Sequence, residues 1–288
     1  QTRRIEVYGG RHPLLLIKHG MRGTVPFNLK VEPGNSVVIT GPNAGGKTVL
    51  IKSIGLLALM AQSGIHIPAG PDTNFHIFDK ILVDIGDSQS IDDDLSTFSS
   101  HLSNIKNIVE QAGRNTLVLI DEIGTGTDPD SGAAISRSIL MKLHSAGSLV
   151  FSTTHLSALK ALASEIEGFY NASMSFDTDE LKPTYQFRQG IPGSSYAFEI
   201  LIRLGFDKDF IDTATGFVQD ISAGLEKILL EVEEREQELM TKLNHFEKEN
   251  TRLTGLSNLY EKKVKELDKE KNNILREAKE KAAVFIDE

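Results

Sequence analysis

The sequence contains no cysteine, and none of its apolar runs is long enough to span a bilayer. The absence of cysteine excludes disulfide bonds and thiolate metal sites and fits a reducing compartment, so we expect a cytoplasmic protein. A membrane-spanning helix needs about 20 mostly apolar residues, and the N-terminus shows no signal-peptide pattern. The sequence therefore predicts no membrane partner.

Positive charge is also scarce, with 31 lysine and arginine residues against 40 aspartate and glutamate residues. The net charge of −9 argues against a generally basic nucleic-acid-binding surface but leaves room for a local basic patch. Hydrophobic residues make up 40% of the chain and charged residues 25%, which is ordinary for a soluble globular protein. Because the chain starts at Gln1 and stops within a charged helical pattern, we expect it to be a piece of a longer protein.

Proline is missing from the last third of the chain, since all nine prolines lie at or before Pro192. Up to about Gly216, short apolar runs alternate with amphipathic stretches. This alternation is typical of a parallel sheet covered by helices on both faces, so we predict an α/β fold with a mostly parallel central sheet. The predicted strands span residues 36 to 40, 80 to 86, 116 to 121 and 148 to 155, and the predicted helices end near 62 or span 96 to 112 and 132 to 145.

Two further regions, residues 1 to 35 and 168 to 188, look like short edge strands around this sheet. After residue 216 a seven-residue repeat of nine apolar or aromatic residues runs from Val218 to Ile274. A second series, four residues further on, is only about half apolar. A sustained heptad repeat favours a coiled coil over a single solvated helix with one apolar stripe. We therefore divide the chain into edge strands (1 to 35), a core (36 to 216) and a helical coiled-coil arm (217 to 288).

The stretch GPNAGGKT, residues 41 to 48, has the spacing of a phosphate-binding loop between a strand and a helix. Glycines let backbone N–H groups converge on phosphate oxygens, and the helix N-terminus adds its positive dipole end. Lys47 supplies a charge for the β- and γ-phosphates, and the hydroxyl of Thr48 can ligate Mg²⁺. A glycine turn before an ordinary helix would not need this lysine and threonine. The predicted nucleotide-binding residues are Gly41, Pro42, Asn43, Ala44, Gly45, Gly46, Lys47, Thr48 and Val49.

Two carboxylates follow the apolar run TLVLI, which ends at residue 120. Asp121, at the carboxyl end of a buried strand, is placed to hold the metal ion, and Glu122 is placed to act as general base on the attacking water. His155 follows another apolar strand and is expected at the same edge, near the γ-phosphate. A helix cap or a surface pair could explain the acids alone, and a lone histidine is usually structural. Together they predict hydrolysis of a nucleoside triphosphate with Mg²⁺, with Glu122, His155 and Lys47 as the catalytic residues.

Five stretches resemble the MutS family, within the ABC-type P-loop ATPases. Their details resemble the second bacterial MutS type (MutS-two), which lacks a mismatch-recognition domain. This resemblance implies a clamp-and-lever region and a C-terminal Smr-type nuclease domain in the whole protein, both absent here. The stretches are GRHPLL (10 to 15), TGPNAGGKT (40 to 48), DLSTFSSHLSNI (94 to 105), DEIGTGTDPDSGAA (121 to 134) and GIPGSSYAFEILIRLG (190 to 205).

The resemblance also implies roles for single residues. Ser96 and Thr97 match the signature that reaches the γ-phosphate bound by the opposite subunit, although Ser96 alone could be a plain helix cap. Asp128 matches the loop that faces the other subunit. Asn43 is expected near the γ-phosphate, the family's adenine-stacking aromatics have only Tyr185 or Phe187 as candidates, and Arg11–His12–Pro13 is expected to support the nucleotide from beneath.

The composite signature implies a head-to-tail homodimer. As its target, the resemblance implies branched DNA, with suppression of homologous recombination, or else stalled ribosomes whose subunits are split. A nucleotide-dependent dimerisation module without turnover is a third hypothesis. The absence of an LSGGQ-like segment disfavours an ABC transporter subunit. Only 72 residues, 49 to 120, separate the phosphate loop from Asp121, so a chromosome-cohesion ATPase with an inserted coiled coil is excluded.

Overall fold

The computed structural model describes residues 4 to 42, 45 to 86, 94 to 177, 180, 182 to 193 and 196 to 216, together with separated positions between 235 and 271. It divides into two compact units, Gln1–Leu229 and Leu230–Glu288. Among the described residues, no helix is both long and apolar enough to cross a bilayer.

A six-stranded sheet, counted over the described residues of the first unit, forms the centre of the fold, with the strand order β4-β5-β6-β3-β7-β8. Neighbouring strands from β4 to β7 are parallel, and β8 runs antiparallel to β7. The prediction of a mostly parallel sheet is confirmed. The strands are β3 (Ser36–Thr40), β4 (Lys80–Asp84), β5 (Thr116–Ile120), β6 (Leu149–Thr153), β7 (Phe169–Asp177) and β8 (Lys182–Gln189).

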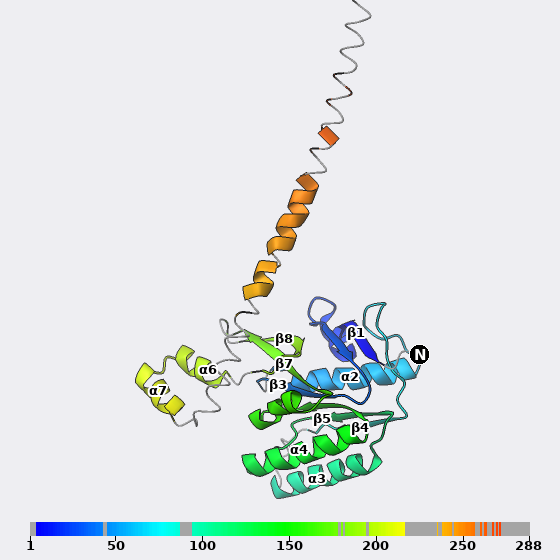
Figure 1. Cartoon of the computed structure of the whole chain (residues 1–288), viewed down its shortest axis with the longest axis vertical. Helices are drawn as coiled ribbons and strands as arrows, with labels where there is room; N and C mark the ends of the chain where they lie inside the picture. The colour runs from blue at the N-terminus through cyan, green and yellow to red at the C-terminus, as the bar shows by residue number, and fades with distance from the viewer. Residues whose placement is uncertain are drawn as a thin grey trace, which may run out of the picture. The chain divides into compact units, whose positions relative to one another are not determined.

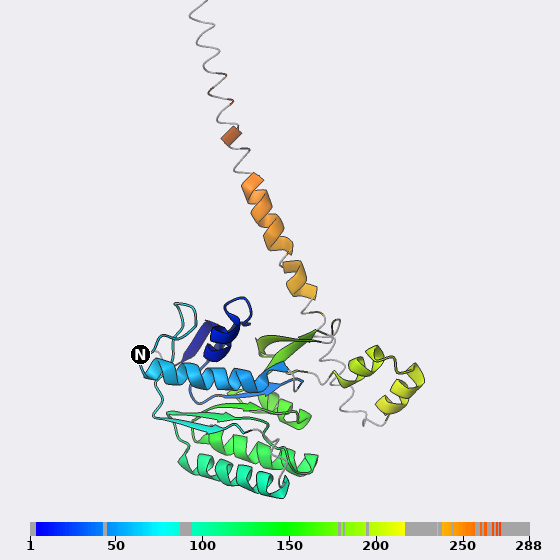
Figure 2. The same cartoon turned by 180° about the vertical axis from the view of Figure 1, so that it is seen from behind.

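Helices cover both faces of this sheet (Figure 1), and the view from behind shows α2 on one side and α3 and α4 on the other (Figure 2). The two layers agree with the alternation expected for strands buried on both faces. Each predicted helix is present, with boundaries that differ by up to three residues. The helices of the core are α2 (Lys47–Gln62), α3 (Asp94–Gln111), α4 (Pro129–Ser145), the 3₁₀ turn η2 (Ser157–Ala161) and α5 (Leu162–Glu165).

The apolar strands divide their side chains between two cores. In β3, Val37 and Ile39 pack into the cluster beneath α2, whereas Val38 packs into the cluster beneath α4. All three are fully buried, so none of these three positions can become polar without loss of packing. The strand therefore provides a rigid base for the loop that follows it.

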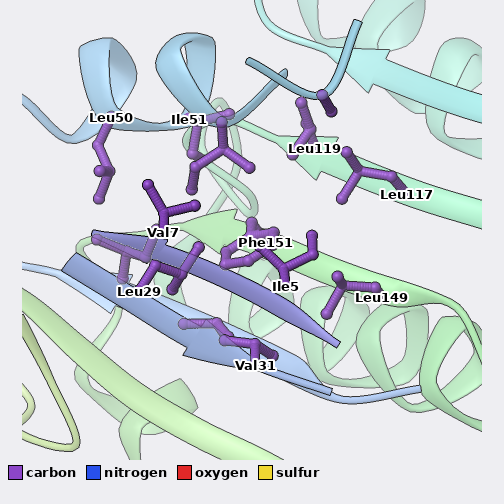
Figure 3. Packing of buried hydrophobic residues seen from close by; sticks show 14 of the residues in the cluster. Ile5, Val7, Leu29, Val31, Leu50, Ile51, Leu117, Leu119, Leu149 and Phe151 are labelled. Carbon is purple, nitrogen blue, oxygen red and sulfur yellow. The ribbon is translucent and has the colours of Figure 1, made fainter. Parts of the chain in front are cut away.

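The structure corrects our expectation of edge strands over residues 1 to 35. The strands β1 (Ile5–Gly10) and β2 (Phe27–Val31) pair antiparallel with each other in a sheet of their own. Helix α1 (Pro13–His19) lies between them in the sequence. His12 is its N-cap, and Pro13 takes the first helical position, where proline is favourable. Figure 3 shows that their apolar side chains, such as those of Ile5 and Val7, join the core beneath α2.

After β8, two short helices, α6 (Ala197–Arg203) and α7 (Lys208–Gly216), end the described part of the first unit. The segment that leads to them contacts the base of the phosphate loop: the N–H of Gly193 donates to the Thr40 hydroxyl oxygen at 2.7 Å. Tyr196 is buried and stacks on Phe176, with 5.4 Å between ring centroids. These contacts fix the connection at both of its ends.

In the second unit, the described residues between 235 and 271 are helical. The heptad positions described there carry large exposed side chains, 59% to 71% accessible, at Leu239, Phe246, Leu253, Tyr260 and Leu267. The coiled coil itself stays a prediction, because no partner helix covers these residues within the described part of the chain. The start of the arm, from 217 to 234, lies outside the described residues.

Candidate active site at the carboxyl edge of the sheet

The phosphate loop runs from the end of β3 to the start of α2. Gly41 has φ 124° and Gly46 has φ 92°, a conformation that glycine adopts without strain. A Cβ at Gly41 would lie 3.1 Å from the Met174 carbonyl oxygen, and one at Gly46 would lie 3.1 Å from the Tyr185 ring. Both positions therefore need glycine for the backbone and for space. Asn43 and Ala44 lie outside the described residues.

Lys47 is the first residue of α2 and is only 3% exposed. Its Nζ donates to the carbonyl oxygens of Gly41 at 2.7 Å and Pro42 at 3.0 Å, so the ammonium group lies within the curve of the loop. Burial lowers the pKa of Lys47, and the charges of Glu122 and Asp121 oppose this by raising it. The loop thus holds a buried cation that faces two carboxylates, beside the positive end of a 16-residue helix.

The two carboxylates follow β5. In the sheet, β6 lies beside β5 and β3 lies beside β6, so the carboxyl ends of these three parallel strands meet at one edge. Asp121 is buried, and the Thr153 hydroxyl at the end of β6 donates to its carboxylate. The same hydroxyl oxygen accepts the N–H of Glu122 at 2.7 Å. One fully buried threonine side chain therefore contacts both the predicted metal ligand Asp121 and the backbone of the predicted base Glu122. Thr153 was not among the residues predicted from the sequence, although it lies two residues before His155 in the run STTH.

Glu122 adopts φ 50°, a left-handed conformation that a residue with a Cβ rarely takes. Its carbonyl oxygen accepts the Thr125 hydroxyl at 2.9 Å and the Thr125 N–H at 3.3 Å. The next N–H, of Ile123, donates to the Thr153 carbonyl oxygen at 2.9 Å. Surrounding hydrogen bonds therefore hold a strained turn, which is common where a catalytic group must be aimed.

The chemistry of the predicted metal ligands fits Mg²⁺. Thr48 in the first turn of α2 offers a half-buried hydroxyl and Asp121 a carboxylate, and Mg²⁺ prefers oxygen ligands. Among the described residues, no group of three or more histidine, aspartate or glutamate side chains could hold a metal ion by itself. A Mg²⁺ ion at this edge would therefore take its remaining ligands from phosphate and water, as such sites usually do.

The other predicted site residues differ in their position and in their exposure to solvent. His155 is exposed directly after β6, at the edge that carries Asp121. Ser96 and Thr97 lie in the first turn of α3, where only the backbone is described. Asp128 is exposed and caps α4, since its carboxylate accepts the Ser131 N–H at 2.9 Å, and this bond lowers the pKa of Asp128. Val49 is 40% exposed beside the loop.

A cavity of about 360 Å³ opens beside the loop and is large enough for a small ligand. Both candidate aromatics, Tyr185 and Phe187, line it together with Gly46, Val49 and His12. Tyr185 has φ 57°, a strained backbone conformation, and its ring lies close to Gly46 of the loop. His12 accepts the N–H of Leu15 as the cap of α1, and burial, followed by the charge of Lys52, lowers its pKa.

Arg11 precedes His12, which lines this cavity, and bonds to the backbone on both sides of α1. Its Nε donates to the Thr24 carbonyl oxygen and one terminal nitrogen to the Gly9 carbonyl oxygen, both at 3.2 Å. These bonds tie the start of α1 to the loop that precedes β2. The support of the nucleotide from beneath that we expected of Arg11–His12–Pro13 stays a prediction.

A glycine-rich loop with a buried lysine, a strand-end carboxylate pair and a parallel sheet define the class of P-loop nucleoside triphosphatases. Within it, residues 37 to 222 match the model of MutS domain V. The chain belongs to the MutS family and contains its ATPase domain.

The chain is also similar to whole proteins. It is 42% identical over 283 residues to Endonuclease MutS2 of Pelotomaculum thermopropionicum, and the aligned residues cover 98% of this chain and 35% of that protein. It is 43% identical over 287 residues to Endonuclease MutS2 of Alkaliphilus metalliredigens, covering 99% of this chain and 36% of that protein. The resemblance to the second MutS type is confirmed. The chain spans about a third of the length of these relatives.

Proposed function

We propose that this MutS2-like ATPase domain hydrolyses ATP with Mg²⁺, using Glu122 as general base. The single observation that carries the proposal is geometric: the loop after β3 holds the buried ammonium group of Lys47, and Asp121 and Glu122 follow β5, two strands along the same edge of the sheet. A carboxylate pair opposite a loop-bound cation is the arrangement that phosphoryl transfer requires.

In the proposed reaction, the amides of the loop and Lys47 bind the phosphates, and Tyr185 stacks on the base. Thr48 and Asp121 would hold Mg²⁺, which supplies positive charge at the phosphate oxygens when bound. Glu122 accepts a proton from the attacking water, and the water oxygen bonds to the γ-phosphorus. The bond between the γ-phosphorus and the oxygen that bridges to the β-phosphate breaks, which releases ADP and phosphate. His155 contacts the γ-phosphate from the end of β6.

Glu122→Gln tests this assignment. The amide keeps the size of the side chain but cannot accept the proton, so we expect turnover to fall by about 10²-fold or more while Mg-ATP binding persists. A phosphate-release assay measures turnover, and calorimetry measures binding. Glu167→Gln, an exposed change before β7, is the matched control. Unchanged turnover in Glu122→Gln would remove the base assignment, whereas Mg-ATP binding without turnover in the wild-type protein would favour a dimerisation module without hydrolysis.

We further propose that the working unit is a homodimer in which each site is completed by the partner's signature helix. Ser96 lies in the first turn of that helix, α3, and Asp128 is exposed on the loop before α4. The expected switch closes the dimer on ATP binding and reopens it on hydrolysis. The exposed heptad residues of the arm support a coiled coil that transmits this motion.

Mixing two inactive variants tests the composite site in a protein extended to the length of its relatives. Lys47→Ala removes one half of a site and Ser96→Ala the other. A mixed dimer contains one site with both halves intact, so we expect mixtures to recover a substantial part of wild-type turnover although neither variant is active alone. If the turnover of the mixture equals the sum of the turnovers of the two variants alone, each chain hydrolyses ATP by itself.

In the whole protein, we propose that the switch opens and closes a clamp on branched DNA and so suppresses homologous recombination. The relatives carry the name endonuclease, which favours a nucleic-acid target. Nuclease activity would belong to a domain outside this chain. A full-length protein trapped by Glu122→Gln can be purified from cells with its bound partners. Co-purification of branched DNA would support the proposal. Co-purification of ribosomes would contradict it and favour the hypothesis that the protein splits stalled ribosomes.

A further inference from the structure

A buried acid lies one strand away from the catalytic pair. Asp84 ends β4 and is 7% exposed. Two side chains from α3 contact its carboxylate: Asn104 Nδ2 donates to Oδ1 at 2.7 Å, and His101 Nδ1 lies 2.7 Å from Oδ2. Asn104 also donates to the Val83 carbonyl oxygen at 3.3 Å. The carboxylate is thus removed from water and held by the helix that begins near Ser96, through a hydrogen bond from Asn104 and a close contact with His101.

The backbone of Asp84 leads directly to the active site. Its carbonyl oxygen accepts the N–H of Asp121 at 2.8 Å, one residue past the end of the ladder that pairs β4 with β5. The amide that follows Asp121 belongs to Glu122. A displacement of Asp84 therefore reaches the predicted metal ligand through a single hydrogen bond and the base through one further peptide.

The imidazole of His101 also reaches the far side of the catalytic turn. It lines a small cavity with Gly124, Thr125 and Thr127, in the loop that follows Glu122. Thr125 holds the Glu122 carbonyl oxygen. His101 thus contacts Asp84, whose carbonyl oxygen accepts the Asp121 N–H, and shares a cavity with the loop that follows Glu122. Its Nε2 is buried with no hydrogen-bond partner among the described residues, an arrangement that usually has a functional reason.

A purely structural role does not require this polar cluster. Apolar side chains already anchor α3, since Ile105 and Ile108 are each only 3% exposed. Replacing a buried charged contact by apolar groups is often neutral for stability. What a polar contact adds is direction, because it holds one rotamer at one distance. At a site where misplacement by about 1 Å can cost 10²-fold in rate, direction has value.

We propose that His101 is a positioning residue that, through Asp84, couples the signature helix α3 to the Asp121–Glu122 turn. The coupling rests on the proposed function, in which the start of α3 contacts the nucleotide held by the partner. When that contact orders α3, the His101–Asp84 contact sets the turn for proton abstraction. Hydrolysis then proceeds only after the dimer has closed.

His101→Phe, His101→Asn and Asp84→Asn test the coupling in the full-length dimer. Phenylalanine fills the space without a donor, so we expect kcat to fall about tenfold or more while the KM for ATP stays within about twofold. The Asn side chain offers an amide nitrogen near the position of Nδ1, so His101→Asn should recover most of kcat. The double variant with His101→Phe and Asp84→Asn should be no slower than the worse single variant, because both changes break one contact.

Ile108→Ala is the matched control, because it loosens the packing of α3 without touching the polar cluster. It should lower Tm while the folded protein keeps its kcat. If His101→Phe behaves like Ile108→Ala, or if His101→Asn rescues nothing, His101 is a structural anchor and the proposal is wrong. Glu122→Gln, measured alongside, separates the two levels: unchanged turnover there overturns the proposed base, whereas a loss there with normal kcat in His101→Phe overturns the coupling alone.

Discussion

The two ends of the nucleotide site are built in different ways. The phosphate end consists of contiguous loops at neighbouring strand ends, and Lys47, Asp121 and Thr153 there are all buried. The end beside the 360 Å³ cavity is assembled from α1, α2, β7 and β8, segments that lie far apart in the sequence. Tyr185 in this wall is 51% exposed. Rigid backbone thus defines one end, and side chains from several elements define the other.

This difference separates two kinds of effect. In the proposed reaction, buried groups at the phosphate end contact or position the groups that act on the reacting atoms, so their loss should act on kcat. In the same proposal, groups around the cavity would contact the nucleotide equally in its ground and transition states, so their loss should act on KM. Substitutions at the two ends therefore test whether the division is real.

The largest effect is expected for Thr153→Val. The change keeps the shape of the side chain but leaves the Asp121 carboxylate and the Glu122 N–H without their shared partner. We expect kcat to fall by about 10²-fold, because the turn that carries both acids shifts, and stability to fall by about 1–3 kcal/mol. Steady-state ATPase rates and thermal unfolding measure these two losses.

Two neighbouring changes serve as controls for Thr153→Val. Thr153→Ser restores the hydroxyl and should restore turnover. Thr154→Val removes another buried hydroxyl, which donates to the Ile123 carbonyl oxygen rather than to a carboxylate. It should cost similar stability with a much smaller loss of kcat. Equal kcat losses in both valine variants would mean that general loosening, and not the carboxylates, limits turnover.

A smaller effect, confined to binding, is expected for Tyr185→Ala. Stacking of an aromatic ring on a base contributes about 1–3 kcal/mol, so we expect the KM for ATP to rise about tenfold with kcat within about twofold. Tyr185→Phe keeps the ring and should change neither constant. A KM that stays at the wild-type value in Tyr185→Ala would place the base elsewhere and leave Phe187 as the remaining aromatic candidate.

The same contrast explains what could be predicted from the sequence. Continuous apolar strands and the GPNAGGKT stretch fixed the sheet and the loop, because each is a local pattern with one strong physical reason. Helix α1 escaped prediction because it is only seven residues long and has no apolar face that becomes buried. Thr153 and the Asp84–His101 contact escaped because they depend on which strands become neighbours. A threonine or an acid at a strand end has many uses until its partners are known.

The smallest effect concerns His12 and pH. As the cap of α1, its Nδ1 accepts the Leu15 N–H, so protonation would remove the acceptor. Burial, together with Lys52, lowers the pKa of His12 in the folded protein below its ordinary 6.5. The unfolded chain therefore binds more protons, and this contribution to stability is present above pH 6.5 and is lost as pH falls toward the folded pKa.

His12→Asn keeps an acceptor that does not titrate. Because His12 is only partly buried and solvent screens its charge, we expect the fall in Tm between pH 7 and pH 5 to be only about 1–2 °C smaller in His12→Asn than in wild type. An identical pH dependence in both proteins would show that the α1 cap does not limit acid stability, and that the cavity wall tolerates a charged imidazole.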